Sequence, residues 1–322
     1  MVESKTEIME TPLRIFLPKF VGNKSTDLDM AKNISRREAL KNMGKAIGVV
    51  ALATSGFSAV AAALPEKKRL VFYFTATGNS LYVAKQFSDK PLSIPQEMKS
   101  DNLVYEADEI GFVFPDYAAT APLMVREFVE KATFKAPYIF SVITFGNAAV
   151  NVTEWWDNYA KEHGVVNNYI NTLLMVDNYL PVFDMNQQMQ IDKHTDENLA
   201  KIVADVNAGK GLIPEVGEQA GFMAGMLKQL QDSHFPMEAE RLLAIDRDRC
   251  VTCNTCSQVC PSGNFRITDN GVEFSGSCEY CLACVHSCPQ KALYLKAGER
   301  NREARYRHPE VSLGEIIRSN KQ

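Results

Sequence analysis

Eight cysteines lie between residues 250 and 288, and none lies elsewhere in the 322-residue chain. They form two copies of Cys-x-x-Cys-x-x-Cys-x-x-x-Cys-Pro, namely CVTCNTCSQVCP at 250–261 and CEYCLACVHSCP at 278–289. The first three cysteines of such a motif wrap a loop around one face of a cubane cluster, and the fourth ligates the other cluster. The spacing therefore predicts two [4Fe–4S] clusters, one held by Cys250, Cys253, Cys256 and Cys288 and the other by Cys278, Cys281, Cys284 and Cys260.

Two zinc sites or a small disulfide knot are the alternatives for so many thiols in one segment. A zinc site usually takes two ligand pairs separated by a longer loop, whereas each motif here has three evenly spaced cysteines and a fourth that follows them. His286 lies inside the second motif, but a complete set of thiolates leaves it no ligand role. We therefore expect His286 to lie beside a cluster or at the surface.

The stretch from about residue 246 to residue 295 resembles the bacterial two-cluster ferredoxins, with both motifs intact. The resemblance implies a pseudo-twofold α+β module whose clusters lie close enough together for fast electron exchange.

A second candidate site follows the first apolar run, in LVFYFTATGNSL at 70–81. The run ends at Phe74, and the loop 75–80 leads directly into a helical pattern. A loop between a strand and a helix N-terminus presents backbone N–H groups to an anion. Thr and Ser hydroxyls without Lys or Arg suit a terminal phosphate monoester, whereas a Walker loop needs its Lys and a dinucleotide fingerprint needs its glycine spacing. An ordinary capped helix start is the alternative.

This loop looks like the phosphate loop of flavodoxins, which bind FMN. The segments 112–122, 144–151 and 176–184 agree with the resemblance, because each follows a predicted strand, where open α/β sheets bind ligands. The resemblance implies FMN as a cofactor, with contacts from Thr75, Ala76, Thr77, Gly78, Asn79, Ser80, Tyr117, Gly146, Asn147 and Tyr179.

Four aromatic residues near these loops have two possible roles. Tyr117 and Tyr179 are candidates to stack on or flank the isoalloxazine ring, or else they are surface tyrosines. Trp155 and Trp156 lie on a helical pattern beyond the third of the four loops, where core packing is favoured over contact with the flavin.

The elements that must position these residues alternate between strand and helix. Apolar runs predict strands at 70–74, 110–114, 138–145 and about 172–176, with a weaker one near 92–95 or 103–105. Helical patterns fall at about 79–89, 121–133, 152–162, 195–208 and 217–231. Strands too apolar for a one-sided sheet predict an α/β fold with a parallel sheet covered on both faces. The two resemblances imply that this is a flavodoxin-like doubly wound parallel sheet followed by a small α+β two-cluster ferredoxin domain.

The domain organisation follows from these patterns. We expect an N-terminal extension and signal at 1–68, a flavodoxin-like domain at 69–240, a ferredoxin domain at 241–296 and a C-terminal tail at 297–322. The tail has no core pattern of its own, so we expect it to pack on the surface.

The two halves together match the EFR1 family of flavodoxin–ferredoxin fusions, and the similarity runs from about residue 69 to residue 318. It includes a tail like RYRHPEVSLGEII at 305–317. One departure is the loop after the fourth strand, where Gly146 is followed by Asn147-Ala148-Ala149 in place of a glycine-rich stretch. The resemblance implies an adapter that takes two electrons at a flavin and passes them singly through clusters.

Three functions remain open from the sequence. The first is an electron carrier that relays electrons between FMN, the clusters and a partner oxidoreductase. The second is an enzyme that reduces a small substrate directly at the flavin, and the third is a cluster-only protein whose flavodoxin half has lost FMN. The net charge of −4 argues against a nucleic-acid partner. The electron-carrier function implies redox proteins as partners.

The N-terminal region resembles an export signal. Ser35-Arg36-Arg37-Glu38-Ala39-Leu40-Lys41 is similar to a twin-arginine motif, and an apolar stretch rich in small residues follows at 46–64. Small-x-small sites predict cleavage near 61–64, and Met30 is a plausible start codon. The stretch suits a cleavable signal better than a permanent membrane anchor, so we expect export to the periplasm; a solvated helix in a cytoplasmic protein is the alternative.

Overall fold

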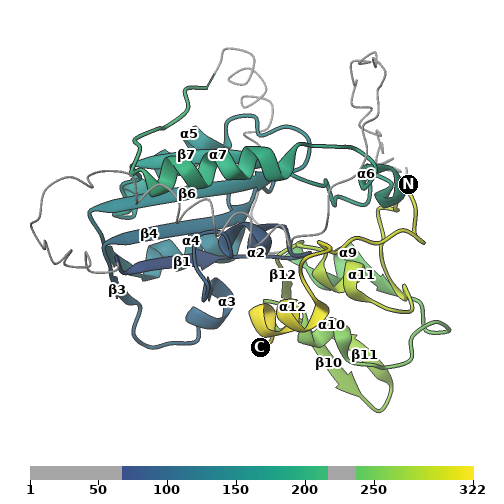
Figure 1. Cartoon of the computed structure of the whole chain (residues 1–322). Coiled ribbons are helices and arrows are strands. Elements are labelled where there is room, and N and C mark those ends of the chain that lie inside the picture. Colours follow the sequence, from purple (N-terminus) through teal and green to yellow (C-terminus); the bar gives the residue numbers. More distant parts are fainter. Residues whose placement is uncertain (1–66, 217–236) are drawn as a thin grey trace, which may run out of the picture. The chain divides into compact units, whose positions relative to one another are not determined.

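A parallel sheet of five strands is the centre of the first half of the structure, a computed structural model that describes residues 67–216 and 237–322 (Figure 1). In spatial order the strands are β2 (Leu92–Ser93), β1 (Arg69–Tyr73), β4 (Glu109–Pro115), β6 (Tyr138–Phe145) and β7 (Tyr169–Leu174). Numbered along the chain, this is the order 2-1-3-4-5 of flavodoxin-like doubly wound sheets. The predicted fold class is confirmed.

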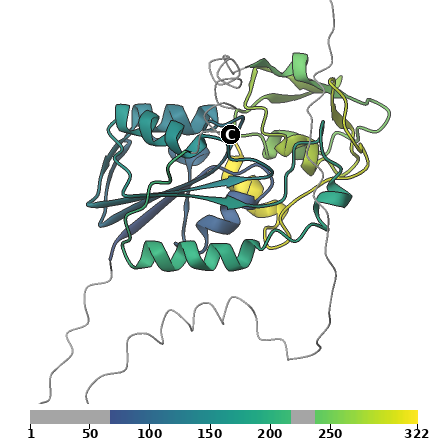
Figure 2. The same ribbon diagram turned by 90° about the horizontal axis from the view of Figure 1, so that it is seen from above.

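The central strands are buried on both faces, as their continuous apolar sequences predict. Strands β1, β4 and β6 contribute Phe72, Phe112 and Phe140, whose side chains are all fully buried. Helices cover the sheet on both sides: Figure 2 shows α4 (Leu123–Lys131) and α5 (Val152–Glu162) along one face and α7 (Thr195–Asn207) along the other. Their amphipathic sequences place apolar stripes on the sheet and leave polar residues in water.

Several element boundaries differ from the predicted ones. Helix α2 (Asn79–Ala84) ends before residue 89, because the N–H groups of Gln86 and Phe87 bond to carbonyls only three residues back and the chain then turns toward β2. Both weak strand candidates exist, since β2 joins the main sheet while β3 (Val104–Glu106) pairs with β5 (Thr133–Lys135). The predicted helix at 217–231 and the predicted signal lie outside the described residues.

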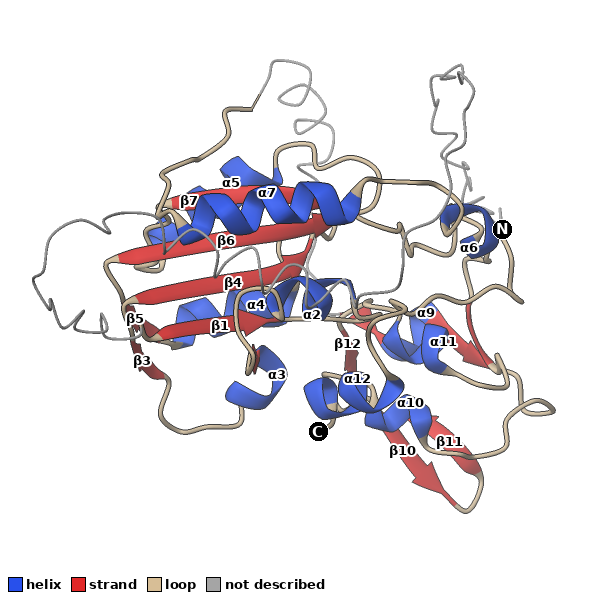
Figure 3. Ribbon diagram, viewed as in Figure 1, coloured by secondary structure: helices blue, strands red, loops and turns tan. Residues whose placement is uncertain are grey.

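The second half contains short antiparallel strand pairs and, at the two cysteine motifs, one very short helix each (Figure 3). The pairs are β8 (Met237–Glu238) with β12 (Ser277–Cys278), β9 (Leu243–Ile245) with β13 (Leu293–Leu295), and β10 (Phe265–Thr268) with β11 (Gly271–Phe274). The helices are α10 (Thr255–Gln258) and α11 (Ala283–Ser287), and each carries the third cysteine of one motif. Helix α9 (Ala239–Leu242) spans the predicted boundary at 240/241.

The C-terminal tail is not a surface appendage, which corrects the expectation from its sequence. Its helix α12 (Leu313–Asn320) begins with a capping box between Ser312 and Glu315. Tyr306, Val311 and Ile316 are at most 4% exposed, although they are too widely spaced to form a recognisable core pattern. All described residues belong to one compact unit, and the tail packs against both halves of it.

Candidate functional site

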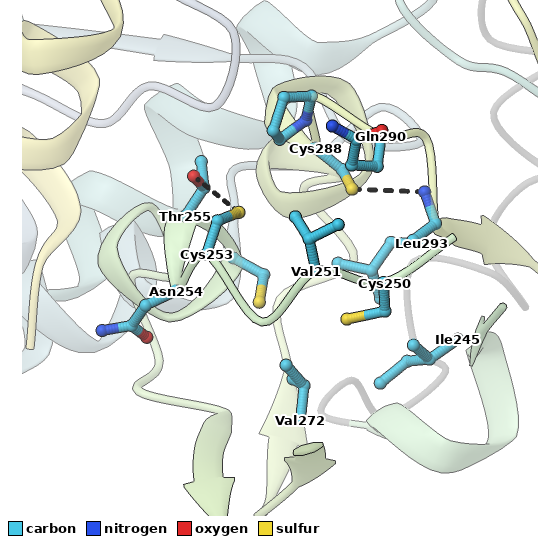
Figure 4. A pocket seen from close by; sticks show the side chains of 13 residues that line it. Ile245, Cys250, Val251, Cys253, Asn254, Thr255, Val272, Cys288, Gln290 and Leu293 are labelled. Carbon is cyan, nitrogen blue, oxygen red and sulfur yellow. Dashed lines mark hydrogen bonds between the residues drawn. The ribbon is translucent and has the colours of Figure 1, made fainter. Parts of the chain in front are cut away.

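The first cysteine set surrounds one cavity in the second half of the chain (Figure 4). Cys250, Cys253 and Cys256 come from the loop before α10 and from that helix, and Cys288 comes from the end of the other motif. The remaining wall is largely apolar, including Ile245, Val272 and Leu293. The fourth cysteine of the second motif thus joins the first three of the first motif.

The second set surrounds a second cavity in the reciprocal way. Cys278, Cys281 and Cys284 line it together with Cys260, the last cysteine of the first motif. Three of the four are at most 9% exposed, whereas Cys253 of the first cavity is exposed. The second cavity is therefore the more deeply buried of the two.

The thiols around each cavity suit a polynuclear cluster better than a single ion. All eight are free cysteines, so no disulfide joins them. Within the described residues no three His, Cys, Asp or Glu side chains stand close enough to share one metal ion. Four sulfurs that line a common cavity without converging on a point match ligands placed at the corners of a cubane, in contrast to the tight tetrahedron of zinc.

The backbone around each cavity is held in a strained form that is the same in both motifs. Thr252 and Asn254 flank the second cysteine of the first motif with φ of 54° and 64°, and Tyr280 and Leu282 flank that of the second with 54° and 62°. Non-glycine residues adopt this left-handed conformation at a cost, and such strain gathers at functional sites. Alternating conformations of this kind turn successive N–H groups to one side, where they stabilise anionic sulfur.

Burial opposes ionisation of most of the thiols in the free chain. Burial raises the pKa of Cys256 to about 12 and that of Cys278 to about 11. The pKa of Cys253 shifts in the other direction, because a hydrogen bond with the Thr255 hydroxyl, 3.4 Å from its sulfur, lowers it. Iron ions, when bound, supply the positive charge that holds such groups as thiolates, so the site fits a cationic cluster and couples folding to its binding.

Comparison with known proteins agrees with this geometry. A family model described as a 4Fe-4S dicluster domain matches residues 242–289. An uncharacterized ferredoxin of Methanocaldococcus jannaschii is 34% identical over 59 residues, which cover 77% of that protein and 17% of this chain. The chain belongs to the dicluster ferredoxins. The membership rests on residues 242–289. The part of the chain that contains them, residues 237–296, is called the ferredoxin module below.

Longer relatives share only the ferredoxin module. A respiratory nitrate reductase beta chain of Bradyrhizobium is 43% identical over 56 residues, and one component of an ion-translocating oxidoreductase complex of Methanosarcina acetivorans is 42% identical over 48 residues. The alignments cover 17% and 15% of this chain but 21% and 18% of those relatives. The chain thus spans about a fifth of the length of these two proteins.

Among solved structures, a putative flavoprotein from Bacteroides uniformis aligns over 97% of its own chain and 42% of this one, at 16% identity and a TM-score of 0.28. The assignment of the first half to the flavodoxin-like class rests on its own strand order. No helix among the described residues has the length and apolar character needed to cross a membrane.

The loop predicted to hold the FMN phosphate adopts the expected place between β1 and α2 but has almost no accessible surface. Every residue from 75 to 80 is buried, and the five with side chains are at most 9% exposed. The Thr77 hydroxyl accepts a hydrogen bond from the Asn178 side chain at 2.6 Å, and the Ser80 hydroxyl lies 3.0 Å from that of Thr144. The Thr77 and Ser80 hydroxyls thus already contact partners within the protein, with Thr77 as the acceptor in its bond.

Of the residues predicted to contact the flavin ring, Tyr117 and Tyr179 lie toward the ferredoxin module, whereas Gly146 and Asn147 do not. The Tyr117 hydroxyl is buried and finds no hydrogen-bond partner within residues 67–216 and 237–322, and the charges that act on it include those of Cys281 and Cys278. The Tyr179 hydroxyl lies 3.4 Å from that of Tyr280 in the second cysteine motif. Gly146 packs tightly against Asp177, and Asn147 is exposed.

The tryptophans divide between core and surface of helix α5. Trp156 is fully buried and its indole N–H donates to the Ser141 hydroxyl at 2.8 Å, whereas Trp155 is half-buried and stacks on Tyr159. The phosphate loop is buried, and Tyr117 and Tyr179 lie toward the ferredoxin module. The described residues as arranged therefore do not fit FMN.

Sequence reasoning missed the residues that join the two halves. His286 is buried, and its Nδ1 accepts the backbone N–H of Tyr306 at 3.1 Å. Its Nε2 lies 2.9 Å from the carbonyl oxygen of Asn178, so the neutral Nε2–H tautomer satisfies both contacts. Glu279, beside a predicted ligand, accepts from the backbone N–H groups at the start of α4. The only available signal was the unexplained histidine inside the motif.

Proposed function

We propose that this protein is an electron carrier that passes electrons through two [4Fe–4S] clusters to or from a redox partner protein. The observation that carries the proposal is the pair of four-cysteine cavities, each completed by the last cysteine of the other motif. Cys250, Cys253, Cys256 and Cys288 would hold one cluster, and Cys260, Cys278, Cys281 and Cys284 the other. Such clusters, when bound, accept and release one electron at a time.

The surroundings of the two cavities give them different roles. Val251 beside the first cavity is 61% exposed and Cys253 is exposed as well, so a partner can approach this cavity directly. Glu279 lines the second cavity, and the Tyr117 hydroxyl of the flavodoxin-like half is close enough to Cys281 and Cys278 to feel their charges. The residues around the first cavity therefore form the exchange surface, and those around the second exclude water.

Anaerobic purification tests the proposal. We expect about eight iron atoms per chain and, after reduction, the EPR signals of two interacting clusters. Zinc in place of iron, or disulfides in the anaerobically isolated protein, would contradict it. A Val251→Glu variant is expected to keep its iron but to exchange electrons more slowly with protein partners, because the new charge lies on the exchange surface.

The partner is proposed to be an oxidoreductase or another electron carrier. Two relatives are named as parts of a nitrate reductase and of an ion-translocating oxidoreductase complex, which supports a role in electron delivery. FMN and direct reduction of a small substrate have no part in the proposal, because the phosphate loop is covered. Turnover of a small acceptor by the purified chain, without a partner protein, would favour an enzyme instead.

Export by the twin-arginine route is a separate proposal, supported by the Arg36-Arg37 motif and the small-residue stretch at 46–64. The route carries folded proteins, which suits a chain whose clusters must be loaded before export. Cell fractionation with an Arg36→Lys, Arg37→Lys variant tests it. Loss of the periplasmic form in the variant is expected, and full-length wild-type protein found only in the cytoplasm would refute export.

A further inference from the structure

The C-terminal segment 305–322 makes direct hydrogen bonds to the phosphate loop. The backbone N–H of His308 donates to the Thr77 carbonyl at 2.8 Å, and the Tyr306 hydroxyl donates to the Asn79 side-chain oxygen at 2.7 Å. The Asn320 side chain donates to the Thr75 carbonyl at 2.9 Å. In all three bonds the segment supplies the donor and the loop the acceptor, so the segment covers the loop through its oxygens and these bonds do not engage the N–H groups that a phosphate would need.

The close approach at Gly78 shows how tightly the segment packs. Gly78 has φ of +103°, and a Cβ added to it would lie 2.9 Å from the Cβ of Val311 and 3.1 Å from that of His308. The ring of His308 also stacks on Tyr82 of α2, with centroids 4.1 Å apart. Packing of this density is typical of a protein interior.

The same segment is tied to the ferredoxin module. The Asn320 amide that binds the loop also donates to the Val259 carbonyl at 3.2 Å, one residue beyond α10. The N–H of Tyr306 bonds to His286 at 3.1 Å in α11. Moving the segment away from the loop would therefore break contacts beside both cysteine motifs, which opposes its acting as a lid.

We propose that segment 305–322 permanently takes the place of FMN on this chain's phosphate loop, so that the flavodoxin-like half serves as a docking platform for the ferredoxin module. The loop geometry that receives a cofactor phosphate in flavodoxins here receives the protein's own C-terminus. The inference goes beyond the electron-carrier function, which depends on the cysteines alone.

FMN titration of the cluster-loaded wild-type chain, combined with hydrogen exchange, tests the inference. We expect no saturable quenching of FMN fluorescence, and slow exchange at residues 305–320 that added FMN leaves unchanged. Stoichiometric FMN in the purified protein, or saturable binding, would overturn the inference, and faster exchange of the segment on FMN addition would identify it as a displaceable lid. Iron content is measured on the same sample, so failure here stays distinct from failure of the carrier function.

Two glycine variants test the contact itself. Gly78→Ala and Gly164→Ala both place a side chain at positive φ, but a Cβ at Gly164 meets nothing within 4 Å. We expect Gly78→Ala to accelerate hydrogen exchange of residues 305–320 by about tenfold or more, and Gly164→Ala to leave it unchanged. A tenfold change corresponds to a lost contact worth about 1.4 kcal/mol. Equal exchange of the segment in the two variants would contradict the proposed docking.

Discussion

The side-chain amide of Asn320 donates a hydrogen bond to the carbonyl oxygen of Thr75 at 2.9 Å, across almost the whole length of the described chain. The same nitrogen reaches the carbonyl of Val259 at 3.2 Å, and Asn320 has no exposed surface. One buried amide thus satisfies a carbonyl in each half of the molecule. Buried polar groups that lose such a partner carry the full cost of their desolvation.

Replacing Asn320 should therefore destabilise the protein. We expect Asn320→Ala to lower the free energy of unfolding by about 2 kcal/mol, because two buried carbonyls lose their donor. Asn207→Ala is the matched control, since Asn207 is exposed and its side chain accepts a hydrogen bond from Arg69 at the surface. Urea unfolding followed by tryptophan fluorescence measures both. A loss for Asn320→Ala no larger than that of the control would show that the bridge contributes nothing.

The last cysteine of each motif lines the cavity of the other motif, and this arrangement gives a specific prediction. Cys288→Ser should impair the cluster bounded by Cys250, Cys253 and Cys256, and Cys260→Ser the cluster bounded by the second motif. Each variant should lose up to about four of about eight irons and retain the EPR signal of one cluster. If Cys288→Ser and Cys278→Ser instead impaired the same cluster, each motif would hold a cluster of its own.

The two tyrosines near the predicted flavin site should respond in opposite ways to loss of their hydroxyls. The Tyr306 hydroxyl donates to Asn79 at 2.7 Å, so Tyr306→Phe should cost about 1 to 2 kcal/mol in the free energy of unfolding. The Tyr117 hydroxyl is buried and has no hydrogen-bond partner among the described residues, so Tyr117→Phe should be neutral or slightly stabilising. Thermal unfolding of both variants measures the difference. A substantial loss for Tyr117→Phe would indicate that its hydroxyl bonds to a bound group.

The sheet was predictable from the sequence because its strands are continuous apolar runs, and burial on both faces leaves no other arrangement for runs such as 138–145. The cysteine sets were predictable because motif spacing alone specifies which thiols lie near one another. The packing of the tail was not predictable from the sequence. Val311, Ile316 and Asn320 are isolated in a polar segment, and they acquire partners only through long-range contacts. The phosphate loop shows the same limit, since its sequence indicates a capacity for anions while its occupant lies more than two hundred residues away.

His308 makes the docked tail sensitive to acid. Burial lowers the pKa of His308 from its usual 6.5 to about 4, with Lys85 lowering it further and Asp196 opposing the shift. Its Nδ1 accepts the N–H of Glu310 at 3.2 Å, which only the unprotonated ring can do. The unfolded chain therefore binds the proton first as the pH falls. Stability from the neutral ring is complete above about pH 6.5 and is lost as the pH falls toward 4, by at most about 3 kcal/mol.

Comparison with His308→Gln isolates this contribution from the other groups that titrate in acid. At pH 7 the glutamine can stack on Tyr82 and accept a hydrogen bond, so the variant should be only slightly less stable than the wild type. Between pH 6.5 and 4 the wild type should lose more stability than the variant, because glutamine does not titrate. Urea unfolding at both pH values measures the two losses. Equal losses would mean that His308 titrates in the folded protein as it does in the unfolded chain, and that its burial in the docked tail does not hold it neutral.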